Sequence, residues 1–116
     1  MSDIERFDVG ARLSEMAVHN GVVHLAGQVP GDARQDMTGQ TKQVLAAIDA
    51  LLVRAGSDKS KILMAQIFIA DMAEFAAMNA VWDAWVVPGH TPPRATVQTR
   101  LGKAEWKVEI VVTAAV

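Results

Sequence analysis

Two short apolar runs stand on either side of Asn20-Gly21 near the start of the chain. Asn-Gly is the dipeptide most typical of a two-residue β-hairpin turn. The pattern therefore predicts a pair of strands over residues 17–19 and 22–29. Pro30 and the glycine after it then interrupt the sheet.

From about residue 38 to residue 55 the pattern becomes helical, because apolar side chains recur at i, i+1, i+4, i+7 and i+8. The stripe consists of Val44, Leu45, Ile48, Leu51 and Leu52. Gly56 stands where a glycine commonly ends a helix. Residues 62–70 then form a nearly continuous apolar run, which is typical of a strand covered on both faces, or covered on one face by helices and on the other by a partner.

A second helix is predicted after Asp71, which forms a capping-box pattern with Glu74, and it ends at Pro88. Residues 94–101 and 106–115 are predicted as the last two strands.

The predicted element order is β-β-α-β-α-β-β, which favours an α+β domain with two layers, a mixed sheet and both helices on one face. The opposite face of such a sheet would also be rich in apolar side chains. Two helices cannot cover both faces, so we expect self-association to bury the second one.

Composition narrows the class of protein. The 116 residues predict a single domain, 1–116. A net charge of −2 without a basic run gives no electrostatic footprint for nucleic acid. The chain has no cysteine, a charged N-terminus and no apolar stretch of membrane-spanning length, so we expect a soluble cytoplasmic protein without a membrane partner.

Two charged residues occupy unusual places in the last two predicted strands. Pro92-Pro93 restricts the backbone before Arg94, and Glu109 stands among apolar residues. If these strands form an antiparallel hairpin, the two side chains can approach across one face and flank a small pocket. A guanidinium held in this way suits a carboxylate ligand. The alternative is a surface ion pair that contributes about 0–1 kcal/mol.

Four stretches resemble the signature regions of the RidA/YjgF family of enamine/imine deaminases: "AGQVP", "FAAMNAVW", "PPRATVQTRL" and "KVEIVVTAAV". The similarity runs from about residue 12 to residue 116 in the same element order, and the combination of "PxR" with "VEI" at this spacing is its most specific part. The resemblance implies a chorismate-mutase-like fold, a homotrimer and active sites in the clefts between subunits.

The resemblance also implies roles for particular residues. Arg94 matches the arginine that binds the substrate carboxylate, and Glu109 matches the glutamate that positions or activates the hydrolytic water. Gly27 falls at the glycine whose backbone lines the site, and Asn79 matches a site asparagine. For Asn79 the alternative is a helix-edge amide bonded to a nearby carbonyl.

The chain departs from the commoner family pattern at two site positions. Leu13 stands where a tyrosine is usual and Thr96 where a cysteine is usual. Carboxylate binding would survive both changes, whereas substrate choice and rate would be affected.

The expected reaction is hydrolysis of a reactive 2-imino acid, the tautomer of an enamine, to a 2-keto acid and ammonia. Placement of substrate and water suffices for this chemistry, so no cofactor, metal or covalent nucleophile is expected. The three histidines, His19, His24 and His90, lack metal-ligand spacing. Two other functions stay open: a non-catalytic trimer that binds small carboxylates, and a ribonuclease or translation inhibitor, against which the acidic balance counts.

Overall fold

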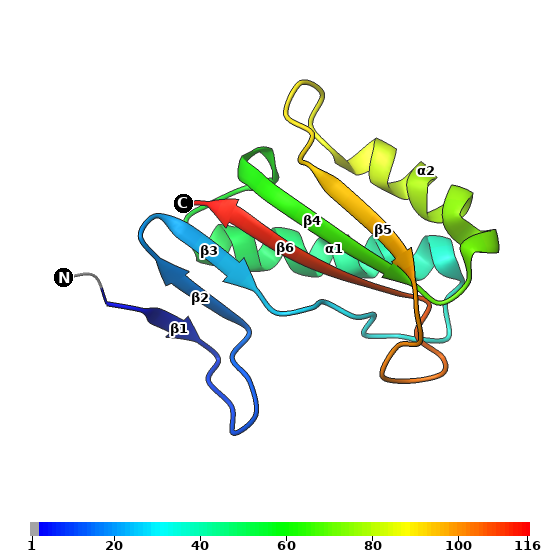
Figure 1. Ribbon diagram of the computed structural model, residues 1–116, viewed down its shortest axis with the longest axis horizontal. Helices are drawn as coiled ribbons and strands as arrows, with labels where there is room; N and C mark the ends of the chain where they lie inside the picture. Colours follow the sequence, from blue (N-terminus) through cyan, green and yellow to red (C-terminus); the bar gives the residue numbers. More distant parts are fainter. Residues whose placement is uncertain (1–2) are drawn as a thin grey trace.

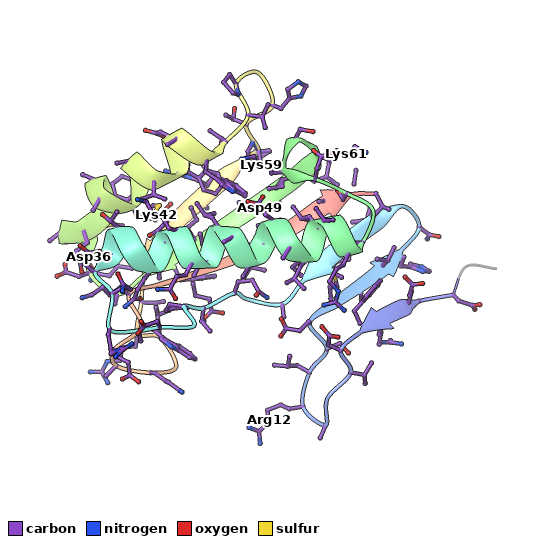
Figure 2. All side chains as sticks on the ribbon, turned by 180° about the vertical axis from the view of Figure 1, so that it is seen from behind. Arg12, Asp36, Lys42, Asp49, Lys59 and Lys61 are labelled. Atoms are coloured by element: carbon purple, nitrogen blue, oxygen red, sulfur yellow. The ribbon has the colours of Figure 1, made fainter. Side chains whose placement is uncertain are left out.

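The computed structural model describes residues 3–116, and in this range two α-helices pack against one face of a six-stranded sheet (Figure 1). In chain order the elements are β1 (Glu5–Phe7), β2 (Met16–His19), β3 (Val22–Leu25), α1 (Met37–Arg54), β4 (Ile62–Ile69), α2 (Phe75–Trp85), β5 (Arg94–Gln98) and β6 (Val108–Ala115), with short 3-10 turns η1 (Lys59–Lys61) and η2 (Met72–Glu74). Figure 2, turned by 180°, shows both helices in front of the sheet. The predicted two-layer α+β architecture is confirmed.

The strands lie side by side in the order β1-β2-β3-β6-β4-β5. Only β4 and β5 run parallel among the pairs of the described sheet, and the other neighbours are antiparallel. A parallel pair needs a crossover connection, which α2 supplies between β4 and β5. The strand β4 thus lies between β5 and β6, with Ala65, Ile67 and Ile69 buried under the helices and Met64 on the opposite, uncovered face of the described chain.

The expected hairpin between the last two strands is wrong, because β4 lies between β5 and β6. Alternation of side chains determines which residues share a face, but it does not determine which strand lies beside which. The crossover through α2 places β5 on one edge of β4, and β6 pairs with the other edge.

Some boundaries also differ from those the sequence predicts. An additional strand, β1, pairs with β2. The strand β3 is shorter than expected, and beyond it Gln28 forms an isolated bridge with Ile110. The strands β5 and β6 are shorter too, because residues 99–107 form a loop.

Turns and helix ends follow the local sequence closely. Asn20 and Gly21 both have positive φ, 51° and 77°, as a type I′ hairpin turn requires. The Asp36 side chain caps α1 by accepting from the Gly39 N–H at 2.9 Å. Gly56, with φ of 80°, follows the last turn of this helix.

The capping box predicted at the start of α2 does not form as a pair. The Asp71 side chain accepts from the Ala73 N–H in η2 and so begins the 3-10 turn. The Glu74 carboxylate faces the Lys107 ammonium at 3.6 Å instead of turning back to the helix start.

The hydrophobic core lies between the helices and the sheet, and the whole predicted stripe of α1 is buried in it. The opposite face of the sheet, which we call the open face, carries many apolar side chains that no other element of residues 3–116 covers. They are Ala17, Val22, Met64, Phe68, Ala95, Val97 and Val111. Met64 and Val97 expose 44% and 46% of their surface. The open face therefore has the apolar character from which we expect self-association.

Within residues 3–116, no helix combines the length and the apolar character that crossing a membrane requires.

Candidate functional site

Arg94 is the first residue of β5 and lies on the side of the sheet that the helices cover. It pairs with Ala65 of β4, which is fully buried in the core. Its guanidinium carbon lies 5.9 Å from the centre of the Phe75 ring and 5.4 Å from the centre of the Trp82 ring, both on α2. The side chain is half-buried, and no carboxylate among residues 3–116 forms an ion pair with it.

Two of the other predicted site residues lie on the same side as Arg94. Thr96 follows it by two residues in β5 and pairs with the buried Ile67. Asn79 is on α2, four residues after Phe75 and therefore on a neighbouring turn of the same helix face. The Thr96 Oγ1 and Asn79 Oδ1 atoms are both buried without a hydrogen-bond partner in the described part of the chain.

Glu109 and Gly27 form a second group, on the open face. Glu109 pairs with Phe68 of β4, whose side chain points away from the helices. Its carboxylate lies directly against Gly27, so that a side chain at position 27 would overlap the carboxylate oxygen. The residues that follow them, Gln28 and Ile110, form a β-bridge, which holds the Gly27 segment against β6.

Leu13 belongs to neither group. It lies in the loop between β1 and β2, exposes 55% of its surface and accepts a hydrogen bond from the Gly10 N–H through its carbonyl. Figure 2 shows this loop projecting beyond the sheet, with the neighbouring Arg12 near its tip.

The prediction that Arg94 and Glu109 share one face is wrong within one chain. Arg94 faces the helices and Glu109 faces away from them, with β4 between their strands. The predicted residues thus form two groups: a helix-side group, Arg94, Thr96 and Asn79, and an open-face group, Glu109 and Gly27. A single chain does not bring the two groups together.

Sequence reasoning did not connect Phe75 and Trp82 with Arg94. The spacing of seven residues between Phe75 and Trp82 is the signal that puts both rings on one face of the second helix. It did not reveal that the guanidinium of a distant residue covers both rings, because this contact depends on the β4–β5 pairing.

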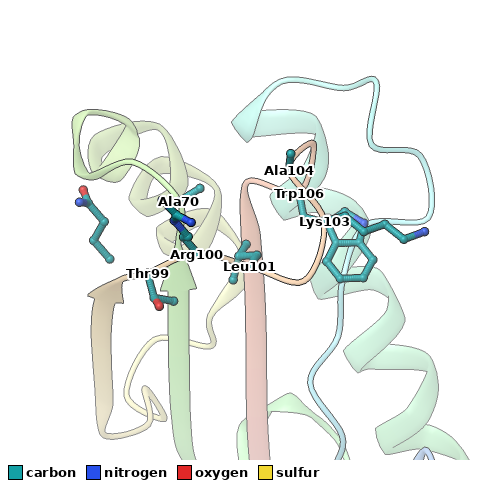
Figure 3. A pocket seen from close by; sticks show the side chains of 8 residues that line it. Ala70, Thr99, Arg100, Leu101, Lys103, Ala104 and Trp106 are labelled. Atoms are coloured by element: carbon teal, nitrogen blue, oxygen red, sulfur yellow. The ribbon is translucent and has the colours of Figure 1, made fainter.

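Two cavities lie away from both groups. The larger, about 480 Å³, is at the end of β5 and in the loop that follows (Figure 3). Its lining residues are Ala70, Gln98, Thr99, Arg100, Leu101, Lys103, Ala104 and Trp106. The smaller, about 290 Å³, lies between α1 and α2 near Trp85. Neither cavity is predicted from the sequence.

Asp32 and Asp8, at other surface positions, are among the carboxyl groups whose pKa values are lowered. Hydrogen bonds from the Arg34 side chain lower the pKa of Asp32 to about 2. A hydrogen bond from the Arg54 guanidinium likewise lowers the pKa of Asp8. Neither carboxyl belongs to the helix-side or the open-face group. No cluster of three or more metal-ligating side chains occurs in the part of the chain that the structure describes.

A family model described as Endoribonuclease L-PSP matches residues 4–116, which is nearly the whole chain. The chain belongs to the RidA/YjgF family. The RutC family protein YoaB of Escherichia coli is 50% identical over 113 residues, which cover 97% of this chain and 98% of YoaB.

Solved structures agree with this membership. A YjgF family protein from Neisseria meningitidis has a TM-score of 0.95 at 47% identity, and the match covers 97% of this chain and 94% of that one. A member of the conserved Rid protein family from Yersinia pestis has a TM-score of 0.86 at 32% identity, covering 93% and 90%. The RidA/YjgF fold predicted from the four sequence stretches is therefore confirmed.

Proposed function

We propose that this RidA/YjgF family member is a hydrolytic deaminase of reactive 2-imino acids, which it converts to 2-keto acids and ammonia. The observation that supports this most is the half-buried guanidinium of Arg94, which has no ion-pair partner among residues 3–116. A fixed guanidinium without a carboxylate partner is suited to bind the carboxylate of a ligand.

In the proposed reaction, Arg94 binds the substrate carboxylate and Glu109 orients the attacking water. The water adds to the imine carbon, and the resulting carbinolamine breaks its C–N bond to give the keto acid and ammonia. Charge-assisted hydrogen bonds to the carboxylate contribute roughly 1.5–3 kcal/mol. Since imine hydrolysis is already fast in water, correct placement of both reactants supplies the acceleration.

The active site would be completed by a second copy of the chain. Arg94 and Glu109 face opposite sides of the sheet, so the helix-side group of one subunit must meet the open-face group of its neighbour. A homotrimer in which the open faces pack inward would achieve this and would also cover the apolar side chains of that face. We place this assembly in the cytoplasm, in keeping with a chain that has no cysteine.

The remaining predicted residues would shape the pocket. Gly27 keeps space for the Glu109 carboxylate. Asn79 and Thr96 flank Arg94, and each has a polar atom without a partner in the described chain. Leu13, in its projecting loop, would contact the substrate side chain and select for apolar groups.

The test is to generate 2-iminopropanoate with an amino-acid oxidase, trap the imine with semicarbazide and measure how fast the protein depletes it. We expect the wild-type protein to accelerate hydrolysis and Arg94→Ala to lose the acceleration. Absence of acceleration with both 2-iminopropanoate and a bulkier imino acid would refute the proposed reaction.

A second candidate is a trimer that binds small carboxylates without turnover. The replacement of the family tyrosine and cysteine by Leu13 and Thr96 favours it. It predicts Arg94-dependent binding with no acceleration in the same assay. Ribonuclease activity, which the description of the family model mentions, is less well supported because the chain has a net charge of −2.

A further inference from the structure

The guanidinium of Arg94 lies over two aromatic rings instead of facing a carboxylate. Its central carbon is 5.4 Å from the Trp82 ring centre and 5.9 Å from the Phe75 ring centre. A cation within about 6 Å of a ring centre is attracted by the electron-rich face. Unlike a carboxylate partner, the rings accept no strong N–H···O bonds, so the donors of the guanidinium stay available for a ligand.

The two rings are themselves held in place. Phe75 and Trp82 are two helical turns apart on one face of α2, and Trp82 is only 5% exposed. The Trp85 ring packs against Trp82 with centres 5.5 Å apart, and its Nε1–H donates to the Asp49 carboxylate of α1 at 2.9 Å. Both helices therefore support the surface beneath the guanidinium.

We propose that Phe75 and Trp82 are positioning residues for Arg94 and set the affinity of this protein for small carboxylates. The inference rests on the proposed function only in taking Arg94 as the carboxylate anchor. The rings hold the guanidinium at one place and orientation before the ligand arrives, which lowers the ordering cost of binding. They act on binding and not on the attacking water, because they contact the guanidinium of Arg94, whereas the water is oriented by Glu109 in the proposed reaction.

The test measures pyruvate binding by calorimetry for the wild-type protein and for Phe75→Leu, Trp82→Leu and Trp82→Phe. We expect each leucine variant to weaken binding by roughly three- to tenfold, and Trp82→Phe, which keeps a ring, to stay within about twofold of wild type. Met78→Leu is the matched control, since Met78 is a buried residue of α2 and this change conserves volume.

A double-mutant cycle separates positioning from general damage to the fold. In an Arg94→Gln background, Phe75→Leu should change pyruvate affinity by less than about twofold, because the cation that the ring holds is already absent. Phe75 is only partly buried, so this variant keeps the test valid if Trp82→Leu does not fold. In the imine assay, Phe75→Leu should raise KM and leave kcat within about twofold of wild type.

Three results would overturn the inference: no pyruvate binding by wild type, wild-type affinity in both leucine variants, or an equal loss in the Arg94→Gln background. A different result would refute the proposed reaction without refuting this inference. Pyruvate binding with the expected variant effects, but without imine hydrolysis, would refute turnover and support the role of the two rings.

Discussion

At Gly27, the missing side chain is what leaves room for the Glu109 carboxylate. A Cβ at this position would overlap the carboxylate oxygen, and the next residue, Gln28, is tied to β6 by its bridge with Ile110. The carboxylate would have to move, because the backbone has little freedom to do so. The position of the proposed water-orienting group thus depends on one glycine.

We expect Gly27→Ala to lower imine hydrolysis by about 10- to 100-fold, as a displacement of about 1 Å at a reacting group commonly does. Gly31→Ala is the control, since the nearest atom to a Cβ there is 3.9 Å away. The two variants should have similar melting temperatures. Equal activity in both would show that Glu109 does not need its present position.

Asp32 illustrates a local charge effect outside the proposed site. Its carboxylate accepts from Arg34 Nε at 2.9 Å and from Nη2 at 3.1 Å, and these bonds lower its pKa to about 2. Because the pKa is lower in the folded protein, the contribution to stability is fully present above the ordinary pKa of 3.8 and is lost as pH falls toward about 2.

In Arg34→Gln we therefore expect the Asp32 pKa to rise toward its ordinary value of 3.8, as measured by an NMR titration of the carboxyl carbon. The pair is exposed, so stability at neutral pH should change very little. An unchanged pKa would mean that other groups cause the shift.

At the scale of elements, Gln40 joins the start of α1 to the loop before β6. It is fully buried, its Nε2–H group donates to the carbonyls of Ala33, Gln35 and Glu105, and its Oε1 accepts from the Lys107 N–H at 2.8 Å. No pattern in the sequence distinguishes Gln40 from an ordinary exposed helix residue. Two of its hydrogen-bond partners, Glu105 and Lys107, lie more than 60 residues further along the chain. Its role became visible only in the fold.

Gln40→Leu removes the hydrogen bonds to these four backbone groups, so we expect a loss of about 2–4 kcal/mol in the free energy of unfolding. Urea denaturation measures it. Gln43→Leu is the comparison, since the Gln43 side chain bonds only to the Asp32 backbone in the described part of the chain, and it should cost about 1 kcal/mol. Equal losses in the two variants would contradict the connecting role of Gln40.

The sequence predicted local features of the fold but not the long-range order of the strands. The Asn20-Gly21 turn, the α1 stripe and the apolar run of β4 depend on neighbouring residues, and all three are confirmed. The β5–β6 hairpin is wrong because strand order depends on the α2 crossover, which alternation does not encode. The same error put Arg94 and Glu109 on one face.

At the scale of the whole molecule, self-association would account for two features at once: the uncovered open face and the separation of the site residues into two groups. Packing open faces together would bury Met64, Val97 and their neighbours, and it would also supply the second half of each site. The apolar pattern predicted self-association, and the resemblance to the RidA/YjgF family implied that the assembly has three subunits.

We expect the wild-type protein to sediment as a trimer and Val97→Asp to sediment as a monomer, because burying an unpaired carboxylate costs several kcal/mol. Val53→Asp is the matched control. Val53 exposes 70% of its surface on α1, away from the open face, and this variant should remain trimeric. A monomeric wild-type protein would contradict the assembly and the shared site with it.

The most direct test of a site shared between subunits mixes two inactive variants, Arg94→Ala and Glu109→Gln, after unfolding and refolding them together in equal amounts. Random trimers place an intact Arg94 opposite an intact Glu109 in about one quarter of the clefts, half of one times half of the other. We therefore predict recovery of about a quarter of wild-type imine hydrolysis. A mixture as inactive as its two components would show that Arg94 and Glu109 do not act across the subunit boundary.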